Sequence, residues 1–263
     1  MRVLVIVHGA GKQLPNYADN VVAAVAGILG AEPLYVPVYY ADIGNVGAPL
    51  LAPMILDPEQ PPVMAEPPQV SQFKMAFAMQ VQTNLDAMSQ TERVVSYSTL
   101  SAQFLAELIA TELNQIIGYL FSQDVYTRIQ GRMSEGLDKA AALGDEIVIA
   151  AHSMGSLVAF DALRAAADKY RVSSFLSMGS PLAILRRMGA RGPELGAISY
   201  ATVREWLNLY DTTDPVSNPL GPQFPLHGYR LRDVFVDVAP LPPASHDYFH
   251  NAEALGIIAS ALC

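Results

Sequence analysis

The sequence is short of several residue types, and each shortage excludes a class of protein. Cys263 is the only cysteine, so the chain can hold neither an internal disulfide framework nor a metal site built on cysteine ligands. Lysine and arginine number 16 against 25 aspartates and glutamates, and the net charge of −9 argues against binding to nucleic acid or to an anionic membrane. Charged residues make up only 16% of the chain and hydrophobic residues 51%, which is above the usual share and enough for a sizeable core.

Long apolar runs and nucleotide-binding motifs are also missing. No stretch of about 18 apolar residues occurs, so no transmembrane helix is predicted. The run at 3–7 is too short for a signal-peptide core and leads directly into His8 and Gly9. The glycines there continue neither as G-x-G-x-x-G nor as G-x-x-x-x-G-K-[ST]. We therefore expect a cytoplasmic protein that uses no cofactor or metal, with a secreted form whose leader has been removed as the alternative.

What the sequence does contain is an alternation of apolar runs and helical stretches. Helices are expected at 17–29, before Glu146 and after Met154. Strands are expected at 3–7, 34–40, 146–151, 172–178, 203–210 and 231–238. This alternation predicts one α/β domain over 1–263, with a doubly wound, mostly parallel sheet of about six strands.

One segment breaks the alternation. Residues 48–68 are rich in proline, and helical stretches at 70–88 and 98–121 follow without a strand. We interpret about 44–121 as a helical cap inserted into the domain. Its aromatic and thioether side chains favour either contact with an apolar ligand or packing of the cap on the core. These side chains are Phe73, Met75, Phe77, Met79, Met88, Phe104 and Phe121.

The segment 147–160 is the most informative one. An apolar run leads into a turn of small residues at Ser153, and an apolar-periodic helix follows. Ala151 and Gly155 stand two residues on either side of Ser153, which gives a G-x-S-x-G pattern with alanine first. A nucleophilic serine needs small neighbours there because strand and helix pass very close at such a turn. The alternative is a buried strand followed by a chance serine.

A nucleophilic serine also needs a histidine base and an acid that orients the base. Among the five histidines, His246 is favoured because it follows the last expected strand, with His250 as its main rival. The side chain of His152 is expected to point away from the serine. Asp211 and Asp214 both follow the strand at 203–210, and either of them could instead cap a turn.

A second small-residue segment, 7–11, follows the first strand. Such a loop can aim a backbone N–H toward the serine. Together with the N–H of Met154, this group would stabilise the oxyanion of a tetrahedral intermediate. Glycine-rich turns also bind phosphate, but the missing nucleotide motifs leave that alternative unsupported.

Together these segments resemble the α/β-hydrolase superfamily, in particular its small serine esterases and lipases. A-H-S-M-G at 151–155 is similar to the nucleophile turn of compact bacterial lipases, and 7–11 is similar to their H-G oxyanion loop. D-P-V at 214–216 resembles the acid loop of phospholipase-like and inositol-deacylase-like relatives. The resemblance covers about 2–43 and 140–260 and does not extend to the cap.

The resemblance implies a role for each candidate residue. Ser153 would be the nucleophile, His246 the base and Asp214 the acid, in the chain order Ser…Asp…His of this superfamily. Ala10 and Met154 would supply the N–H groups of the oxyanion hole. The chain starts directly at the strand before the oxyanion loop, so the usual first antiparallel strands are lacking and a minimal α/β-hydrolase fold is implied.

The implied activity is cleavage of a carboxylic ester through an acyl-enzyme, as in a lipase or esterase that acts on a hydrophobic small-molecule ester. A thioesterase or acyltransferase would use the same acyl-enzyme, so these activities stay open. A non-catalytic member of the fold that holds an apolar ligand under the cap is the alternative from another class. The oligomeric state is left open by the sequence.

Overall fold

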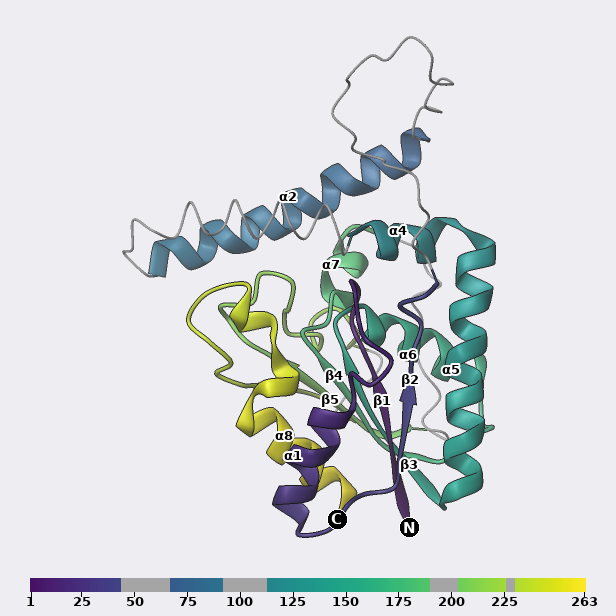
Figure 1. Cartoon of the computed structure of the whole chain (residues 1–263). Coiled ribbons are helices and arrows are strands. Elements are labelled where there is room, and N and C mark those ends of the chain that lie inside the picture. The colour runs from purple at the N-terminus through teal and green to yellow at the C-terminus, as the bar shows by residue number, and fades with distance from the viewer. Residues whose placement is uncertain (44–66, 92–112, 190–202, 226–229) are drawn as a thin grey trace.

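The protein is built around a parallel sheet with helices on both faces (Figure 1). The computed structural model describes residues 1–43, 67–91, 113–189, 203–225 and 230–263. The six strands lie in the order β2-β1-β3-β4-β5-β6, and all neighbouring pairs are parallel. Their bounds are β1 Arg2–Val7, β2 Tyr35–Val38, β3 Glu146–His152, β4 Val172–Met178, β5 Val203–Tyr210 and β6 Leu231–Phe235. The predicted doubly wound α/β sheet is therefore confirmed.

The strands were predicted closely, and the differences lie at the sheet edges. β2 and β6 are shorter than the apolar runs at 34–40 and 231–238 suggested. Both are edge strands with one neighbour each: β2 ends at Val38, opposite the last residue of β1, and β6 ends at Phe235, opposite the last residue of β5. The helices in the described residues are α1 Asp19–Leu29, α2 Pro68–Thr91, α4 Leu113–Phe121, α5 Gln123–Leu143, α6 Met154–Ala165, α7 Leu182–Arg187 and α8 Ala252–Leu262.

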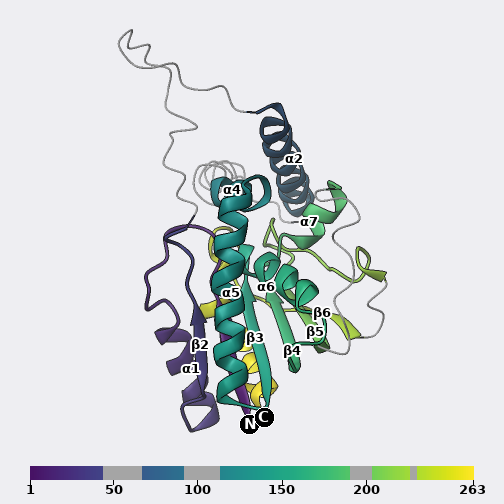
Figure 2. The ribbon, with the colours of Figure 1, turned by 90° about the vertical axis from the view of Figure 1, so that its right-hand side faces the viewer.

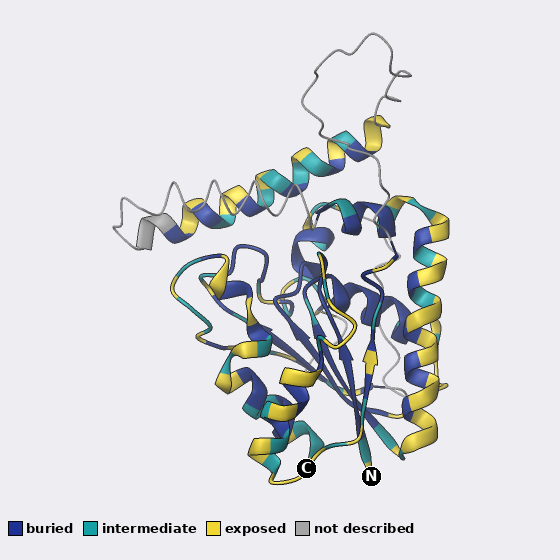
Figure 3. Ribbon diagram, in the orientation of Figure 1, coloured by how far each residue is buried: buried dark blue, intermediate teal, exposed yellow. Residues whose placement is uncertain are grey.

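Alternation of side chains along the strands divides the core into two layers. Val3, Val5 and Val7 of β1 face the layer that contains α5 and α6. Leu4 and Ile6 face the opposite layer, which contains α1 and α8. Figure 2 shows the sheet from the side, and Figure 3 shows that the strands are buried while the outer helix faces are exposed. Because both faces are covered, continuous apolar runs form these strands.

The strand order reverses between β1 and β3, since the chain moves from β1 outward to β2 and then returns to the other side. Ligands of doubly wound sheets bind at such a switch point, beside the carboxyl ends of the strands. The segments that follow β1 and β3 are the His8–Gly9 loop and Ser153. The topology therefore places the two predicted small-residue segments at the same end of the sheet.

The helices of the predicted cap are described only in part. α2 crosses the molecule beyond the carboxyl ends of the strands, and α4 lies next to the start of α5 (Figure 1). A continuous stripe on α2 is buried, formed by Val70, Phe73, Phe77, Val81, Leu85 and Met88. Phe104 and residues 48–66 of the proline-rich block fall outside the described residues. In the part of the chain that the structure describes, no helix is long and apolar enough to cross a membrane.

Candidate active site

Ser153 occupies a strained turn between β3 and α6. Its backbone has φ 50° and ψ −126°, a conformation that residues with a side chain rarely adopt. The Ser153 N–H donates to the carbonyl of Met178 over 2.8 Å, which ties the turn to the end of β4. A Cβ atom on Gly155 would lie 2.8 Å from the carbonyl oxygen of Val7, and it would also collide with that of His8. A glycine is therefore required at position 155, two residues after the serine, because α6 starts directly against the end of β1.

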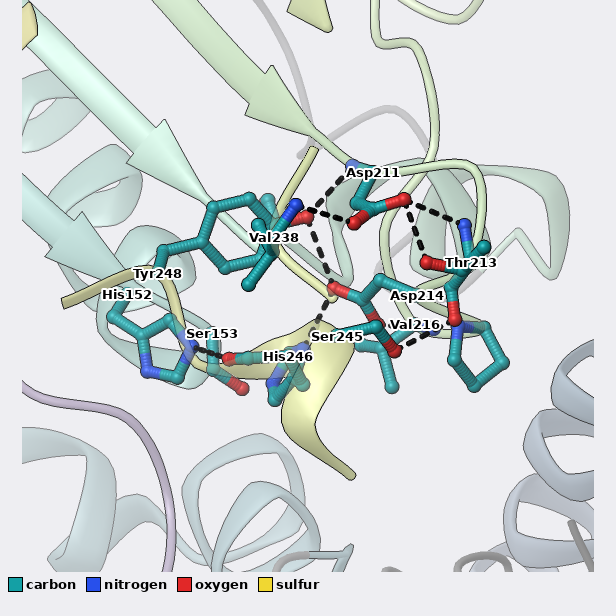
Figure 4. Close-up of polar contacts among 12 residues, drawn as sticks. His152, Ser153, Asp211, Thr213, Asp214, Val216, Val238, Ser245, His246 and Tyr248 are labelled. Carbon is teal, nitrogen blue, oxygen red and sulfur yellow. Dashed lines mark hydrogen bonds and ion pairs between the residues drawn. The ribbon is translucent and has the colours of Figure 1, made fainter. Parts of the chain in front are cut away.

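The site brings His246 and Asp214 into direct contact. Nδ1 of His246 lies 2.7 Å from Oδ2 of Asp214, and both side chains are almost completely buried. A carboxylate only accepts hydrogen bonds, so Nδ1 carries the proton and Nε2 of the neutral ring is left as the base. Figure 4 shows the Ser153 side chain pointing toward this imidazole. Ser153, Asp214 and His246, which come from three separate segments and were predicted as a triad, therefore lie together.

The geometry separates the two candidate acids. Asp211 is 1% exposed, and its carboxylate bonds only backbone and hydroxyl donors. Oδ1 accepts from the N–H and the hydroxyl of Thr213, and Oδ2 accepts from the N–H of Val238 at 2.8 Å. Asp211 therefore closes the loop after β5 onto the segment after β6. Asp214, three residues later, is the carboxylate that contacts the base.

The other histidines lie elsewhere or act differently. His250 ends the 3₁₀ turn Tyr248–His250, is exposed, and bonds Asp247 at 2.8 Å. His227 lies outside the described residues. His246 lies in a second 3₁₀ turn, Ala244–His246, in the segment that follows β6. Of the two rivals named from the sequence, only His246 meets an acid in the site.

His152 was predicted to point away from Ser153, and its side chain contacts the main chain of His246. Its Nε2 lies 2.7 Å from the carbonyl oxygen of His246, and the two rings are 4.7 Å apart. Strand alternation does turn His152 to the face opposite Ala151, but the segment after β6 crosses that same face and carries His246 with it. Burial lowers the pKa of His152 to about 3, with a smaller contribution from His246, so the ring is neutral near pH 7.

The His8–Gly9–Ala10 loop lies directly against Ser153. A Cβ atom on Gly9 would lie 2.9 Å from Cβ of Ser153, and Ala10 follows directly in the loop. Met154 is the first residue of α6, where backbone N–H groups have no partner within the helix. The loop and the helix start therefore lie next to Ser153, and the oxyanion hole of Ala10 and Met154 stays a prediction.

His8 orients this loop. Its Nε2 accepts from the N–H of Tyr40 at 3.0 Å, so its proton sits on Nδ1, which lies 2.6 Å from the carbonyl oxygen of Gly9. The Gly9 carbonyl therefore points to His8, and the N–H of Ala10 points the opposite way, since the two groups of a trans peptide are antiparallel. Burial lowers the pKa of His8 to about 4 and keeps the ring neutral near pH 7.

Two supporting residues were missed by the sequence reasoning. Gln115 of α4 accepts from the N–H of Gly11 at 2.9 Å and so fixes the far end of the loop that follows β1. Tyr248, fully buried, donates to Oδ2 of Asp214 at 3.2 Å and accepts from the N–H of Asp211 at 2.7 Å. Burial, reinforced by the Asp214 charge, raises the pKa of Tyr248 far above its usual value. The only sequence signal for Tyr248 is its place two residues after His246.

A scan against models of known protein families gave no match to this chain, and a search of curated proteins gave none either. The site is therefore interpreted from its own geometry.

Proposed function

We propose that the protein is a serine hydrolase that cleaves carboxylic esters through an acyl-enzyme. The observation that carries the proposal is the buried His246–Asp214 pair beside a serine on a strained strand-to-helix turn. Nucleophilic serines need such a base and orienting acid, and strained turns concentrate at functional sites. A non-catalytic binding protein would have no need for this arrangement.

In this mechanism the Ser153 hydroxyl attacks the ester carbonyl carbon while Nε2 of His246 takes its proton. Asp214 holds the ring in the required tautomer and stabilises the imidazolium. The N–H groups of Ala10 and Met154 stabilise the oxyanion. His246 then gives the proton to the departing alkoxide, which leaves an acylated Ser153. Water, activated by His246, attacks the acyl group, and the proton returns to Ser153 as the carboxylic acid departs.

We further propose a hydrophobic acyl group as the preferred substrate, because an apolar depression lies on α2, the helix that also contacts the acid loop. The depression has a volume of about 350 Å³ and lies where α2, α4 and the end of α7 meet. Its lining is Gln69, Gln72, Phe73, Ala76, Leu120, Phe121 and Met188. A few polar groups in an apolar lining are typical of sites for small ligands.

The helix that forms this depression is anchored to the acid loop. Nδ2 of Asn84 donates to the carbonyl of Pro215, next to Asp214, at 2.7 Å. Nearer its start, Gln80 accepts from Nε of Arg187 at 3.1 Å. A substrate held against α2 would therefore contact an element that is joined to the catalytic acid.

Hydrolysis of p-nitrophenyl butyrate tests the proposal. Wild-type protein should release p-nitrophenol with saturation kinetics, and Ser153→Ala should lower kcat by roughly four to six orders of magnitude. His250→Gln, which alters an exposed histidine outside the site, serves as the matched control and should keep wild-type kcat. A loss of less than about tenfold in a folded Ser153→Ala protein would remove Ser153 from the nucleophile role.

A further inference from the structure

His152 and His246 are joined by a hydrogen bond that the mechanism above does not use. Nε2 of His152 lies 2.7 Å from the backbone carbonyl oxygen of His246 (Figure 4). A carbonyl oxygen only accepts, so Nε2 of His152 must carry the proton and donate it. The base is therefore held through its main chain by the residue that directly precedes the nucleophile.

The backbone of His246 needs such support because it belongs to neither the sheet nor a long helix. The segment between β6 and α8 carries His246 in a three-residue 3₁₀ turn, Ala244–His246. The hydroxyl of Ser245 donates to the carbonyl of Thr213 at 2.7 Å, which anchors the turn to the acid loop. This contact fixes the turn relative to Asp214 but not relative to Ser153.

The hydrogen bond from His152 fixes the turn that carries His246 relative to Ser153. His152 is the last residue of β3, a central strand, and it pairs with Met178 of β4, while the preceding Ala151 pairs with Val7 of β1. Its ring lies 5.6 Å from the ring of Phe249 and 6.0 Å from that of Tyr248, which limits its rotation. A Cβ atom on Gly9 would lie 3.0 Å from its Nδ1, so the oxyanion loop closes the remaining side.

We propose that His152 is a positioning residue, whose Nε2–H holds the main chain of His246 at the distance from Ser153 that proton transfer requires. The inference rests on the proposed function, since it assigns Ser153 and His246 their catalytic roles. Two hydrogen bonds then hold the main chain around His246 in place. Ser245 ties the base to the acid loop, and His152 ties it to the nucleophile strand.

Two amide substitutions separate the hydrogen bond from simple packing. In His152→Gln the amide nitrogen can reach the position of Nε2 and still donate to the His246 carbonyl. In His152→Asn the shorter amide reaches only the position of Nδ1. Both variants are polar, uncharged and fit beside Gly9, and thermal unfolding checks that both fold.

We expect His152→Asn to lower kcat about 100-fold with little change in KM, because misplacing a catalytic group by about 1 Å has an effect of this size. His152→Gln should lose no more than about tenfold. A second readout is the low-field proton resonance of the His246 Nδ1–H···Asp214 hydrogen bond, recorded without substrate. It should be preserved in His152→Gln and shifted or lost in His152→Asn.

The inference is overturned if both variants keep a kcat near that of the wild type. It is also overturned if both lose activity equally while the low-field resonance stays unchanged. Its failure can be told apart from failure of the proposed function. A folded wild-type protein that shows the resonance but hydrolyses no ester would reject the hydrolase, and the resonance in the two variants would still decide the role of His152.

Discussion

Gly9 lies so close to Ser153 that a methyl group on its Cα would stand 2.9 Å from the serine Cβ. Carbon atoms that are not bonded do not approach this closely without strain, so any larger residue at this position must displace the loop or the nucleophile. The glycine after His8 is thus fixed by the position of the serine more than 140 residues later in the chain.

Gly9→Ala should therefore lower kcat about 100-fold, because the loop that carries Ala10 moves away from Ser153. The matched control is Gly131→Ala in α5, where an added Cβ meets no atom within 4 Å. It should keep kcat and raise stability by about 0.5–1 kcal/mol, as alanine does in a helix interior. Steady-state kinetics and urea unfolding measure both effects; equal kcat in the two variants would show that the loop takes no part in catalysis.

Asp214→Asn and Asp211→Asn should affect different quantities. Asp214→Asn should lower kcat by about four orders of magnitude, because an amide favours the wrong tautomer of His246. Asp211→Asn should mainly lower the free energy of unfolding, since an amide cannot accept all the bonds that Asp211 accepts from Thr213 and Val238. Kinetics combined with urea unfolding tests the pair, and the reverse ranking in kcat would move the acid to Asp211.

His8 should make the fold sensitive to acid. Its pKa is 6.5 in the unfolded chain and about 4 in the folded protein, so below pH 6.5 the unfolded chain binds a proton that the folded protein does not. Stability therefore falls as the pH drops from 6.5 toward 4, and His8 accounts for about 2 kcal/mol of the loss between pH 7 and pH 5.

Urea unfolding of His8→Gln at both pH values measures this contribution. The drop in free energy of unfolding between pH 7 and pH 5 should be smaller by about 2 kcal/mol than in the wild type. His250→Gln removes an exposed histidine and controls for the loss of one titratable group. If His8→Gln keeps the full wild-type drop, His8 is not buried in its neutral form as the structure has it.

The depression beside α2 predicts a dependence on acyl chain length. Each buried methylene contributes about 0.8 kcal/mol, which raises kcat/KM about threefold to fourfold per carbon until the space is full. Ala76 lines this depression, whereas Ala87, on the same helix, lines a second one next to Asp214. Ala76→Trp should shift the optimum of the p-nitrophenyl ester series to shorter chains, and Ala87→Trp should not.

A flat profile across the series, or a steady fall from acetate onward, would mean that the apolar side chains of α2 serve packing only. If Ala87→Trp shifted the optimum to shorter chains and Ala76→Trp did not, the acyl chain would lie in the depression next to Asp214.

The strands and the serine turn could be predicted because their signals are local. Continuous apolar runs identify strands covered on both faces, and small residues around Ser153 identify a close strand–helix crossing. The choice between Asp211 and Asp214 could not be made from local sequence signals. It depends on Val238, 27 residues beyond Asp211, whose N–H the Asp211 carboxylate accepts.

The role of His152 was out of reach for the same reason. Strand alternation puts its side chain on the face opposite Ala151, but no local pattern shows that the segment carrying His246 crosses that face. Gln115 and Tyr248 are ordinary helix and turn residues in the sequence, and they become informative only when their partners, Gly11 and Asp214, are known.

Covalent labelling tests most directly whether Ser153 is an activated nucleophile. Folded wild-type protein should react with a fluorophosphonate probe in a one-to-one ratio, and peptide mapping should locate the label on Ser153. Ser153→Ala should not be labelled, and Asp214→Asn should react far more slowly. Absence of labelling in folded wild-type protein, or a label on another serine, would contradict the account.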